Sequence, residues 1–298
     1  MKKKSIIFIK WLFSVLAPRW YIKRRFIAHH HYSPNFKKPK TYLEKLNKRK
    51  YEYTPHMSIL SDKIAVRDYV KKVIGSEYLI PVHSVFDKLT LDIFNKLPDN
   101  FAIKANHGSG YNLIVRDKSK YSFQQMKSIT DKWLNDKYYL TGMELHYRSI
   151  KPRLIVEKLL LNASNEVPKD FKLHIFRGNK GIKIFTEVQA DRFSNFICSY
   201  YDEKWREVKS PFLGEASFFK KVHTQCPENF DELLLLGKKL SSNYPYLRTD
   251  FYVMGGKIYF GELTFTPAGG ALPFEEKKID EYLGALWGKV VEGEKSLI

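Results

Sequence analysis

The stretch Arg248-Thr-Asp-Phe-Tyr-Val-Met-Gly-Gly-Lys-Ile-Tyr-Phe-Gly-Glu-Leu-Thr-Phe-Thr-Pro-Ala-Gly-Gly270 decides the fold of this chain. It predicts a β-hairpin, because two runs rich in aromatic and β-branched residues, at about 247–253 and 257–265, flank a pair of glycines. Two carboxylates, Asp250 and Glu262, stand among these strand residues. Acids in such a place usually have a cation to hold, so we expect the hairpin to carry a charged site.

The register of the hairpin decides whether the two acids share a face. A two-residue Gly-Gly loop would pair Asp250 with Gly261 and turn Glu262 to the opposite face, since side chains alternate along a strand. A three-residue loop from Met254 to Gly256 would instead pair Arg248 with Glu262 and set Asp250 diagonally across from Glu262. We adopt the second register because it separates polar from apolar side chains. One face then holds Arg248, Asp250, Glu262 and Thr264, and the other holds Leu247, Phe251, Val253, Tyr259, Leu263 and Phe265.

The pairing of the two acids indicates a metal. Two carboxylates at cross-strand distance repel each other and raise one pKa unless a cation lies between them. Mg²⁺ prefers a few carboxylate oxygens together with the phosphates of a substrate. The hairpin therefore predicts a magnesium site, and an exposed hairpin with solvated acids is the alternative.

A second signal is the segment Phe101-Ala-Ile-Lys-Ala-Asn-His-Gly-Ser-Gly-Tyr-Asn-Leu-Ile-Val-Arg-Asp117, which predicts strand, glycine-rich loop and strand. Small loop residues let backbone N–H groups approach phosphate oxygens, and Lys104 precedes the loop as a point charge. The loop lacks the Gly-Lys-Ser/Thr ending of a Walker A motif and the G-x-G-x-x-G pattern of a dinucleotide-binding turn. Alone, it could equally be a plain turn.

Two further segments predict strands. The run Arg153-Leu-Ile-Val-Glu-Lys-Leu-Leu-Leu161 is apolar around one acid, as in a buried strand that leaves the core. In Asp170-Phe-Lys-Leu-His-Ile-Phe176, Phe171, Leu173 and Ile175 alternate with Lys172 and His174, so the two sets face opposite sides. Taken alone, Lys172 would be a solvent-facing strand residue.

Together and in this order, these segments resemble the ATP-grasp superfamily, and most closely its TupA-like branch. That branch is named for teichuronopeptide biosynthesis and is found among bacterial surface-polysaccharide genes. The resemblance runs from about Pro34 to the hairpin. Its blocks are Pro39-Lys-Thr-Tyr-Leu-Glu-Lys45, Asp62-Lys-Ile-Ala-Val-Arg-Asp68, Leu97-Pro-Asp-Asn-Phe-Ala-Ile-Lys-Ala-Asn-His-Gly-Ser-Gly110, Asp170-Phe-Lys172, Asp191-Arg-Phe193 and the hairpin itself.

The resemblance implies an α+β fold in which two subdomains with antiparallel sheets hold a nucleotide and a glycine-rich loop closes over its phosphates. It implies ATP and Mg²⁺ as cofactors. Lys104, Lys172, the loop residues His107, Gly108, Ser109 and Gly110, and the adenine-side residues Glu157, Lys158 and Leu159 would bind the nucleotide. Asp250 and Glu262 would bind the metal, with Thr264 where related ligases often carry Asn. Arg248, Lys172 and Arg192 would be catalytic.

The activity implied by the resemblance is an ATP-dependent carboxylate–amine ligase that forms an acylphosphate. Its acceptor would be a carboxylate-bearing glycan of the cell surface or capsule, or a precursor, and its amine donor an amino acid. Such chemistry depends on positioning and charge neutralisation and needs no nucleophilic side chain. A glycosyltransferase is the main alternative, although the chain has no D-x-D motif. A sugar or small-molecule kinase is the other, although the H-R-D and D-F-G signatures of protein kinases are absent.

Charge is concentrated at the N-terminus. Formal net charge is +19, and residues 1–50 hold 15 Lys/Arg against one acid, Glu44. The apolar run from Ile6 to Ala17 contains Lys10 and is well short of the roughly 20 apolar residues that span a bilayer. We expect a basic amphipathic segment that lies on an anionic membrane, with a packed N-terminal helix or a signal segment as alternatives. The expected location is the cytoplasm, at the inner face of the membrane.

Other classes are disfavoured by the composition. Basic residues do not alternate with aromatics as in RNA-binding motifs, so no nucleic-acid partner is expected. Cys198 and Cys226 are too few and too far apart for a zinc site or a disulfide framework.

The 298 residues are sufficient for one composite domain or two small ones. We expect the basic segment at 1–33, an N-terminal lobe at 34–100 and the nucleotide-binding region at 101–298. Helices are predicted at about 41–52, 61–74, 122–136, 228–242 and 275–290. Strands are predicted at about 78–85, 101–105, 111–116, 152–160, 170–177, 181–190, 197–201, 246–253 and 257–265.

Overall fold

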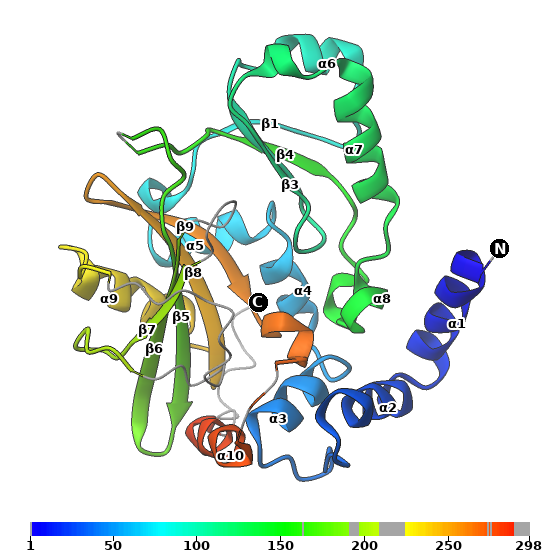
Figure 1. The fold of residues 1–298 in the computed structure, drawn as a ribbon, viewed down its shortest axis with the longest axis vertical. Coiled ribbons are helices and arrows are strands. Elements are labelled where there is room, and N and C mark those ends of the chain that lie inside the picture. The colour runs from blue at the N-terminus through cyan, green and yellow to red at the C-terminus, as the bar shows by residue number, and fades with distance from the viewer. Residues whose placement is uncertain are drawn as a thin grey trace.

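The computed structural model describes residues 2–162, 164–190, 197–208, 224–272, 274 and 276–288, and the side chains from Ile6 onward apart from Ala190 and Ile197. Two antiparallel sheets organise this part of the chain (Figure 1). The first sheet has the strand order β1-β4-β2-β3, with β1 at Val82–Phe86, β2 at Phe101–Ala105, β3 at Asn112–Val115 and β4 at Leu154–Glu157. The second has the order β7-β6-β5-β8-β9, with β5 at Asp170–Gly178, β6 at Gly181–Ala190, β7 at Ile197–Tyr201, β8 at Tyr246–Met254 and β9 at Lys257–Thr264.

Helices lie against both sheets and at the N-terminus. Their bounds are α1 Lys2–Leu16, α2 Pro18–His30, α3 Tyr42–Arg49, α4 Pro55–Ser61, α5 Val66–Val73, α6 Leu91–Lys96, α7 Phe123–Asn135, α8 Tyr139–Gly142, α9 Phe230–Leu240 and α10 Lys277–Leu286. Short 3₁₀ turns lie at Ser76–Tyr78, Lys118–Lys120, Leu145–Tyr147 and Pro267–Gly270. Helix α7 begins at a capping box in which Ser122 and Gln125 satisfy each other's backbone N–H groups, a device that stabilises a helix by about 1 kcal/mol.

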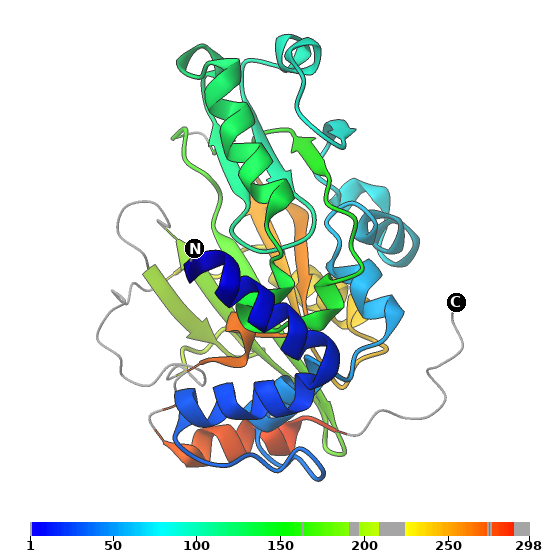
Figure 2. The ribbon, with the colours of Figure 1, turned by 90° about the vertical axis from the view of Figure 1, so that its right-hand side faces the viewer.

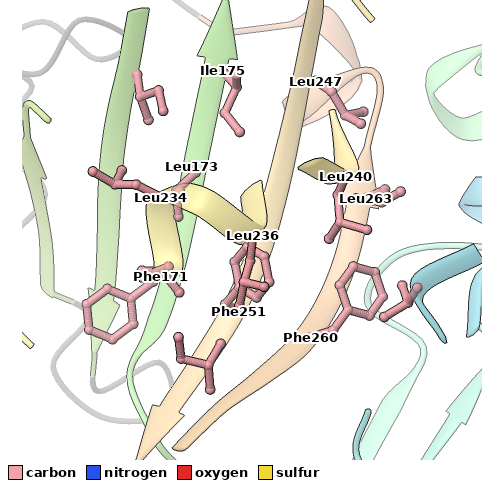
Figure 3. Close-up of a cluster of buried hydrophobic side chains, with 14 of the residues drawn as sticks. Phe171, Leu173, Ile175, Leu234, Leu236, Leu240, Leu247, Phe251, Phe260 and Leu263 are labelled. Atoms are coloured by element: carbon pink, nitrogen blue, oxygen red, sulfur yellow. The ribbon is translucent and has the colours of Figure 1, made fainter. Parts of the chain in front are cut away.

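The second sheet has an apolar face and a polar face. Phe171, Leu173 and Ile175 of β5 pack with Leu247 and Phe251 of β8 in one buried cluster. Helix α9 covers this cluster with Leu233, Leu234, Leu236 and Leu240 (Figure 3). Because side chains alternate along each strand, Lys172 and His174 point to the other face, as the sequence predicts. The apolar side chains are thus buried on one face of the sheet, and the charged side chains of the same strands lie on the other face.

The first sheet has its own core. Its buried residues include Phe101, Ile103 and Val115, and helix α7 contributes Met126 to the same cluster. In Figure 1 this sheet and the helices α6 and α7 form the upper lobe. Strand β1 pairs with β4 in this sheet, so the expected lobe boundary at residue 100 falls between strands of one sheet. The domain limits remain a prediction.

The hairpin differs from the expected register in an informative way. The three-residue loop is wrong: Met254 pairs with Lys257, so the turn holds only Gly255 and Gly256, both with positive φ as a type I′ turn requires. Gly261 is an extra residue in β9, since Asp250 pairs with Glu262 whereas Phe251 pairs with Phe260. A Cβ at Gly261 would lie 3.0 Å from the carbonyl oxygen of Asp250, which favours glycine at this bulge.

The bulge at Gly261 therefore brings Asp250 and Glu262 onto one face of the hairpin, which the three-residue loop was expected to do. Asp250 faces Glu262 directly, and Arg248 faces Thr264 rather than Glu262. The four polar residues share one face, as predicted. Tyr259, which was expected on the apolar face, pairs with Tyr252, and Ile258 and Phe260 join the core instead.

The predicted strands correspond to those of the described part of the chain to within a few residues. The predicted helix at 61–74 was too long, because α4 ends at Ser61 and α5 begins at Val66. Helices α4, α6 and α8 were not predicted; they have seven, six and four residues, too few for a clear hydrophobic period.

Candidate active site

The polar face of the second sheet brings together the charged residues of β5, β6, β8 and β9. Lys172 pairs with Glu187 on one side and with Asp250 on the other. His174 lies opposite Arg248, and Asp250 lies opposite Glu262. The register of four adjacent strands thus sets these side chains in one continuous patch.

Arg248 is the centre of the hairpin part of this patch. Its Nε donates to Asp250 Oδ1 at 2.8 Å and its Nη2 to Asp250 Oδ2 at 2.7 Å, which is a bidentate pair. The same Nη2 donates to Glu262 Oε1 and to Thr264 Oγ1, both at 3.0 Å. Burial opposes the charge of the guanidinium, but Asp250 and Glu262 outweigh it and raise the pKa of Arg248. Arg248 is therefore a permanent cation between two carboxylates.

Lys172 supplies a second buried cation. Its Nζ donates to Asp170 Oδ2 at 2.6 Å and to Asp250 Oδ2 at 2.9 Å. The side chains of Lys172 and Asp250 are 4% and 3% exposed, so the pair is desolvated. Removing one partner of such a pair leaves an uncompensated buried charge.

Lys104 is the third cation and comes from the first sheet. Its Nζ lies 2.6 Å from Glu157 Oε2 on the neighbouring strand β4, and Arg67 Nη1 lies 3.3 Å from the other oxygen of Glu157. Burial opposes the charge of the ammonium, but the attraction of Glu157 exceeds it and raises the pKa of Lys104. Glu157 thus holds two cations in fixed positions.

The glycine-rich loop between β2 and β3 contributes to the wall of the site. Ser109 and Gly110 line a charged cavity between the two sheets, and Gly110 has a positive φ of 79°. A Cβ at Gly108 would lie 2.6 Å from the ring of Tyr138, so the loop packs against aromatic side chains there. His107 is buried beneath the loop, where its Nε2 donates to the carbonyl oxygen of Trp133 at 3.1 Å. The ring of His107 thus attaches the loop to helix α7.

Two adjoining cavities lie between the sheets. The first has a volume of about 90 Å³ and a largely apolar wall. Its lining includes Ile80, Ala102, Ile114, Leu159, Leu160 and Val167. The second, of about 380 Å³, is lined by the charged residues Lys63, Lys104, Asp170, Lys172, Arg248, Asp250 and Glu262. Both cavities include Lys104, Asn112, Asp170, Gln189 and Tyr252 in their walls, so an apolar compartment opens into a charged one.

Comparison with known proteins agrees with this arrangement. The model of the TupA-like ATP-grasp family matches residues 43–287, which is most of the chain. The chain belongs to the TupA-like ATP-grasp family. No curated protein matches it.

Solved structures with the ATP-grasp fold are similar at low identity. D-alanine-D-alanine ligase from Helicobacter pylori is 15% identical, with a TM-score of 0.45, over 77% of this chain and 61% of that one. N5-carboxyaminoimidazole ribonucleotide synthetase from Thermus thermophilus is 12% identical, with a TM-score of 0.38, over 82% and 50%. D-alanine-D-alanine ligase from Bacillus anthracis, complexed with ATP, is 16% identical, with a TM-score of 0.36, over 70% and 57%. This chain therefore spans between half and about three fifths of the length of these three proteins.

The ATP-grasp protein offers an oxygen set that suits magnesium. Asp250 and Glu262 oppose each other across β8 and β9, and both line the charged cavity. Among the residues that the structure describes, no cluster of three or more His, Cys, Asp or Glu side chains is arranged to hold a metal. Mg²⁺ needs no such cluster, because it binds through one or two carboxylates and completes its shell with phosphate oxygens and water. Thr264 Oγ1 donates to Glu262 Oε1 at 3.1 Å and so orients that carboxylate.

A buried histidine–carboxylate pair supports Arg248 and Lys172 from one side. His174 Nε2 lies 3.1 Å from Glu187 Oε2, and His174 Nδ1 lies 2.9 Å from the hydroxyl of Tyr246. Burial opposes ionisation of Glu187, but the hydrogen bond from His174 and the nearby cations lower the pKa of Glu187 to about 2. Burial lowers the pKa of His174 despite the attraction of Glu187. A neutral His174 that donates through Nε2 accepts the Tyr246 hydroxyl at Nδ1, which fixes its tautomer.

The structure brings most of the predicted residues to the two cavities. Glu157, Lys158 and Leu159 line the apolar one, and Ser109, Gly110, Lys172, Arg248, Asp250 and Glu262 line the charged one, with Lys104 in both. His107 and Gly108 position the loop, and Thr264 lies beside Glu262. Arg192, in the block Asp191-Arg-Phe193, lies outside the described residues. The roles of all these residues remain predictions.

Sequence reasoning missed Lys63. Its side chain lines the charged cavity, and its Nζ donates to the carbonyl oxygen of Gly108 in the glycine-rich loop. Burial lowers the pKa of Lys63, and the attraction of Glu262 opposes this. The signal was the block Asp62-Lys-Ile-Ala-Val-Arg-Asp68, which also holds Arg67, the partner of Glu157.

Proposed function

We propose that this protein is an ATP-dependent carboxylate–amine ligase. Its substrates would be a carboxylate-bearing glycan of the cell surface or capsule, or a precursor of one, and an amine donor such as an amino acid. The γ-phosphoryl group of ATP would pass to a carboxylate oxygen of the acceptor, which leaves ADP. The amine nitrogen would then attack the acyl carbon, and inorganic phosphate would leave as the amide bond forms.

One observation carries the proposal: an apolar cavity adjoins a cavity lined by four cations and three acids. A purine base suits the apolar walls around Leu159, Leu160 and Ile80. A triphosphate suits the charged compartment, where Lys63, Lys104, Lys172 and Arg248 converge. Lys104, Asn112 and Tyr252 line both cavities, which supports the idea that one ligand occupies both.

Each side chain has a role that its geometry supports. Lys104 and Lys63 lie at the glycine-rich loop and would hold phosphate oxygens there. Lys172 and Arg248 lie at the two prospective metal ligands and would neutralise charge on the transferring phosphoryl group. A bound Mg²⁺ ion would neutralise phosphate oxygens and orient them for in-line transfer. Asp250 and Glu262 would hold that ion.

Closure of the loop would protect the acylphosphate. The segment from Tyr138 to Tyr147 packs its rings beside the loop, with Tyr138 and Tyr111 in edge contact at 5.7 Å. A closed loop would keep water from hydrolysing the mixed anhydride before the amine attacks.

The location of the substrates suggests where the enzyme works. We propose that it acts in the cytoplasm at the inner face of the membrane, where lipid-linked glycan precursors would reach it. Among the described residues, no helix combines the length and the apolar content needed to cross a membrane.

Ligand-dependent melting tests the first part of the proposal. ATP with Mg²⁺ should raise the melting temperature as its concentration passes the dissociation constant, whereas a UDP-sugar should not. Stabilisation by the UDP-sugar alone would favour a glycosyltransferase and contradict the proposal. A matched protein with Lys104→Met serves as the control, because it should lose most of the ATP response.

Product analysis tests the second part. Uronic acids paired with amino acids should give ADP, inorganic phosphate and an amide, and ADP formation should require both substrates. A stable phosphorylated product formed without an amine would identify a kinase instead. An absence of ADP release with every pair, in a protein that binds ATP, would contradict the ligase proposal.

A further inference from the structure

Helix α1 exposes a continuous apolar face. Five side chains, spaced so that they fall on one side of an α-helix, are exposed there. They are Phe8, Ile9, Leu12, Val15 and Leu16, and we call them the N-terminal apolar face. Phe8 is 61% exposed and Leu16 is 71% exposed. A single exposed apolar residue is ordinary, whereas several neighbouring ones mark a surface that binds another molecule or a membrane.

The opposite side of α1 is attached to the protein. Phe13 stacks on Trp20 and on Tyr21 of α2, with ring centroids 5.2 and 5.3 Å apart. Trp11 packs against a buried cluster that also contains Ile22 and Phe26 of α2. The apolar face therefore belongs to a helix that is held in place at its C-terminal half, and helix α1 lies at the outside of the molecule (Figures 1 and 2).

Positive charge flanks this face. Arg19, Lys23 and Arg24 of α2 are exposed, and the guanidinium of Arg24 lies 5.8 Å from the ring centre of the exposed Trp20. The sequence contains no Asp or Glu before Glu44. An exposed tryptophan beside cations, in the helix that follows an exposed apolar face, is typical of a segment that binds at the boundary between acyl chains and lipid headgroups.

We propose that α1 and the exposed basic side of α2 dock on an anionic lipid bilayer. The N-terminal apolar face would enter the acyl boundary, and Arg19, Lys23 and Arg24 would contact lipid phosphates. Helix α1 has 15 residues and so a length of about 22 Å, shorter than the roughly 30 Å of a hydrocarbon core. It would lie in the plane of the interface.

A second copy of the chain is a less favourable occupant of this surface. Most homodimers are two-fold symmetric and place the same patch of each subunit against its partner. Such contact would bring the cations of one α2 close to those of the other, without an acid between them in this part of the sequence. An anionic bilayer instead supplies the opposite charge at the same depth as the cations.

The docking surface lies one element away from the glycine-rich loop. Helix α1 contacts α8, and Tyr138, which immediately precedes α8, packs against Tyr111 at the end of the loop. A bilayer at α1 would thus hold a lipid-linked acceptor near the charged cavity. This last step rests on the proposed ligase function, whereas the docking itself does not.

Vesicle sedimentation of the full chain tests the proposal. The protein should bind vesicles of phosphatidylcholine with phosphatidylglycerol, bind pure phosphatidylcholine much less, and be released by added salt. Phe8→Glu with Leu16→Glu should lower the affinity at least about 100-fold, since two exposed apolar side chains are lost from the interface. Lys23→Glu with Arg24→Glu should lower it at least about 30-fold.

Controls separate the outcomes. Leu91→Glu with Leu235→Glu places the same charges on leucines that are 54% and 50% exposed elsewhere, and should leave vesicle binding unchanged. Turnover of ATP with soluble substrates should be the same in the Phe8/Leu16 variant and the wild type, so a failed ligase assay leaves the docking result intact. Wild-type protein that ignores anionic vesicles overturns the proposal. So does a wild-type dimer that Phe8→Glu with Leu16→Glu converts to a monomer, since the surface would then be a protein interface.

Discussion

Arg248 holds Asp250 through two hydrogen bonds, 2.8 Å from Nε to Oδ1 and 2.7 Å from Nη2 to Oδ2. Glu262 receives a third bond from the same guanidinium, and Lys172 donates to Asp250 from the other side. The oxygens that would hold a divalent ion are therefore already neutralised by two cations of the protein. A metal bound to these oxygens would compete with Arg248 and Lys172 for them. A side chain that it displaced would then be free to contact the phosphates of a bound nucleotide.

Asp250→Asn should abolish metal-dependent turnover. The amide keeps the shape of the side chain but removes the charge that a hard cation requires. ADP release should fall by about 10²–10³-fold, a loss expected when one group that stabilises transition-state charge is removed. Asp87→Asn, which alters an exposed ion pair with Lys151 and Arg153, is the matched control. Near-normal turnover in Asp250→Asn would show that this carboxylate does not bind the metal.

Lys104→Met should weaken ATP binding about 10- to 100-fold, the value of one hydrogen bond to a charged group. Equilibrium binding of ATP measures the effect, and Lys151→Met, at a lysine whose side chain is 73% exposed, is the control. Lys172→Met should weaken ATP binding too, but it also removes the cation that pairs with Asp170 and one of the two that pair with Asp250, where Arg248 remains. Its free energy of unfolding should therefore fall by about 3–5 kcal/mol. Equal stability of the two lysine variants would contradict this distinction.

The sequence was sufficient for the strands and for the polar face of the hairpin, because side-chain alternation is a local property. The alternation of side chains along a strand alone predicted that Lys172 faces the other side of the sheet from Phe171 and Leu173, and the structure confirms this. The register was only partly predictable. Asp250 faces Glu262 through a bulge at Gly261, and glycine in a strand does not indicate by itself whether a bulge or a regular pair forms.

The partners of the lysines could not be predicted, because they come from distant segments. Glu157 of β4 forms one ion pair with Lys104 of the neighbouring strand β2 and another with Arg67 of α5. These three residues are far apart in the sequence. Lys63, which follows α4, donates to the carbonyl oxygen of Gly108, which follows β2. Only the tertiary structure brings these two segments together. The role of α1 was equally dependent on packing, since Phe13 and Trp11 decide which of its sides is covered.

Gly108→Ala and Gly110→Ala should separate two kinds of loop constraint. A Cβ at Gly108 would lie 2.6 Å from the ring of Tyr138 and 2.7 Å from that of Tyr111, so Gly108→Ala must displace aromatic packing. A Cβ at Gly110 meets nothing within 4 Å, but the φ of 79° strains any residue with a side chain. We expect a loss of about 1–3 kcal/mol in unfolding free energy for the first and about 1 kcal/mol for the second.

The conservative change Gly110→Asn checks the second mechanism. Asparagine tolerates a positive φ better than alanine, so Gly110→Asn should be more stable than Gly110→Ala. Urea unfolding of the three variants gives the comparison. If Gly110→Asn and Gly110→Ala are equally stable, strain at this φ is not what glycine relieves.

Lys50 should make stability rise with pH above neutrality. Burial lowers its pKa from 10.5 to about 8, although Glu144 opposes the shift. The unfolded chain therefore binds more protons than the folded protein between these two values, and stability increases with pH wherever that is so. Relative to Lys50→Met, the wild-type free energy of unfolding should rise by roughly 3 kcal/mol across this window and stay nearly constant below it. Urea unfolding of both proteins at several pH values measures the difference, which cancels the titration of groups common to both. A parallel pH dependence of the two proteins would mean that the ammonium of Lys50 is solvated in the folded state.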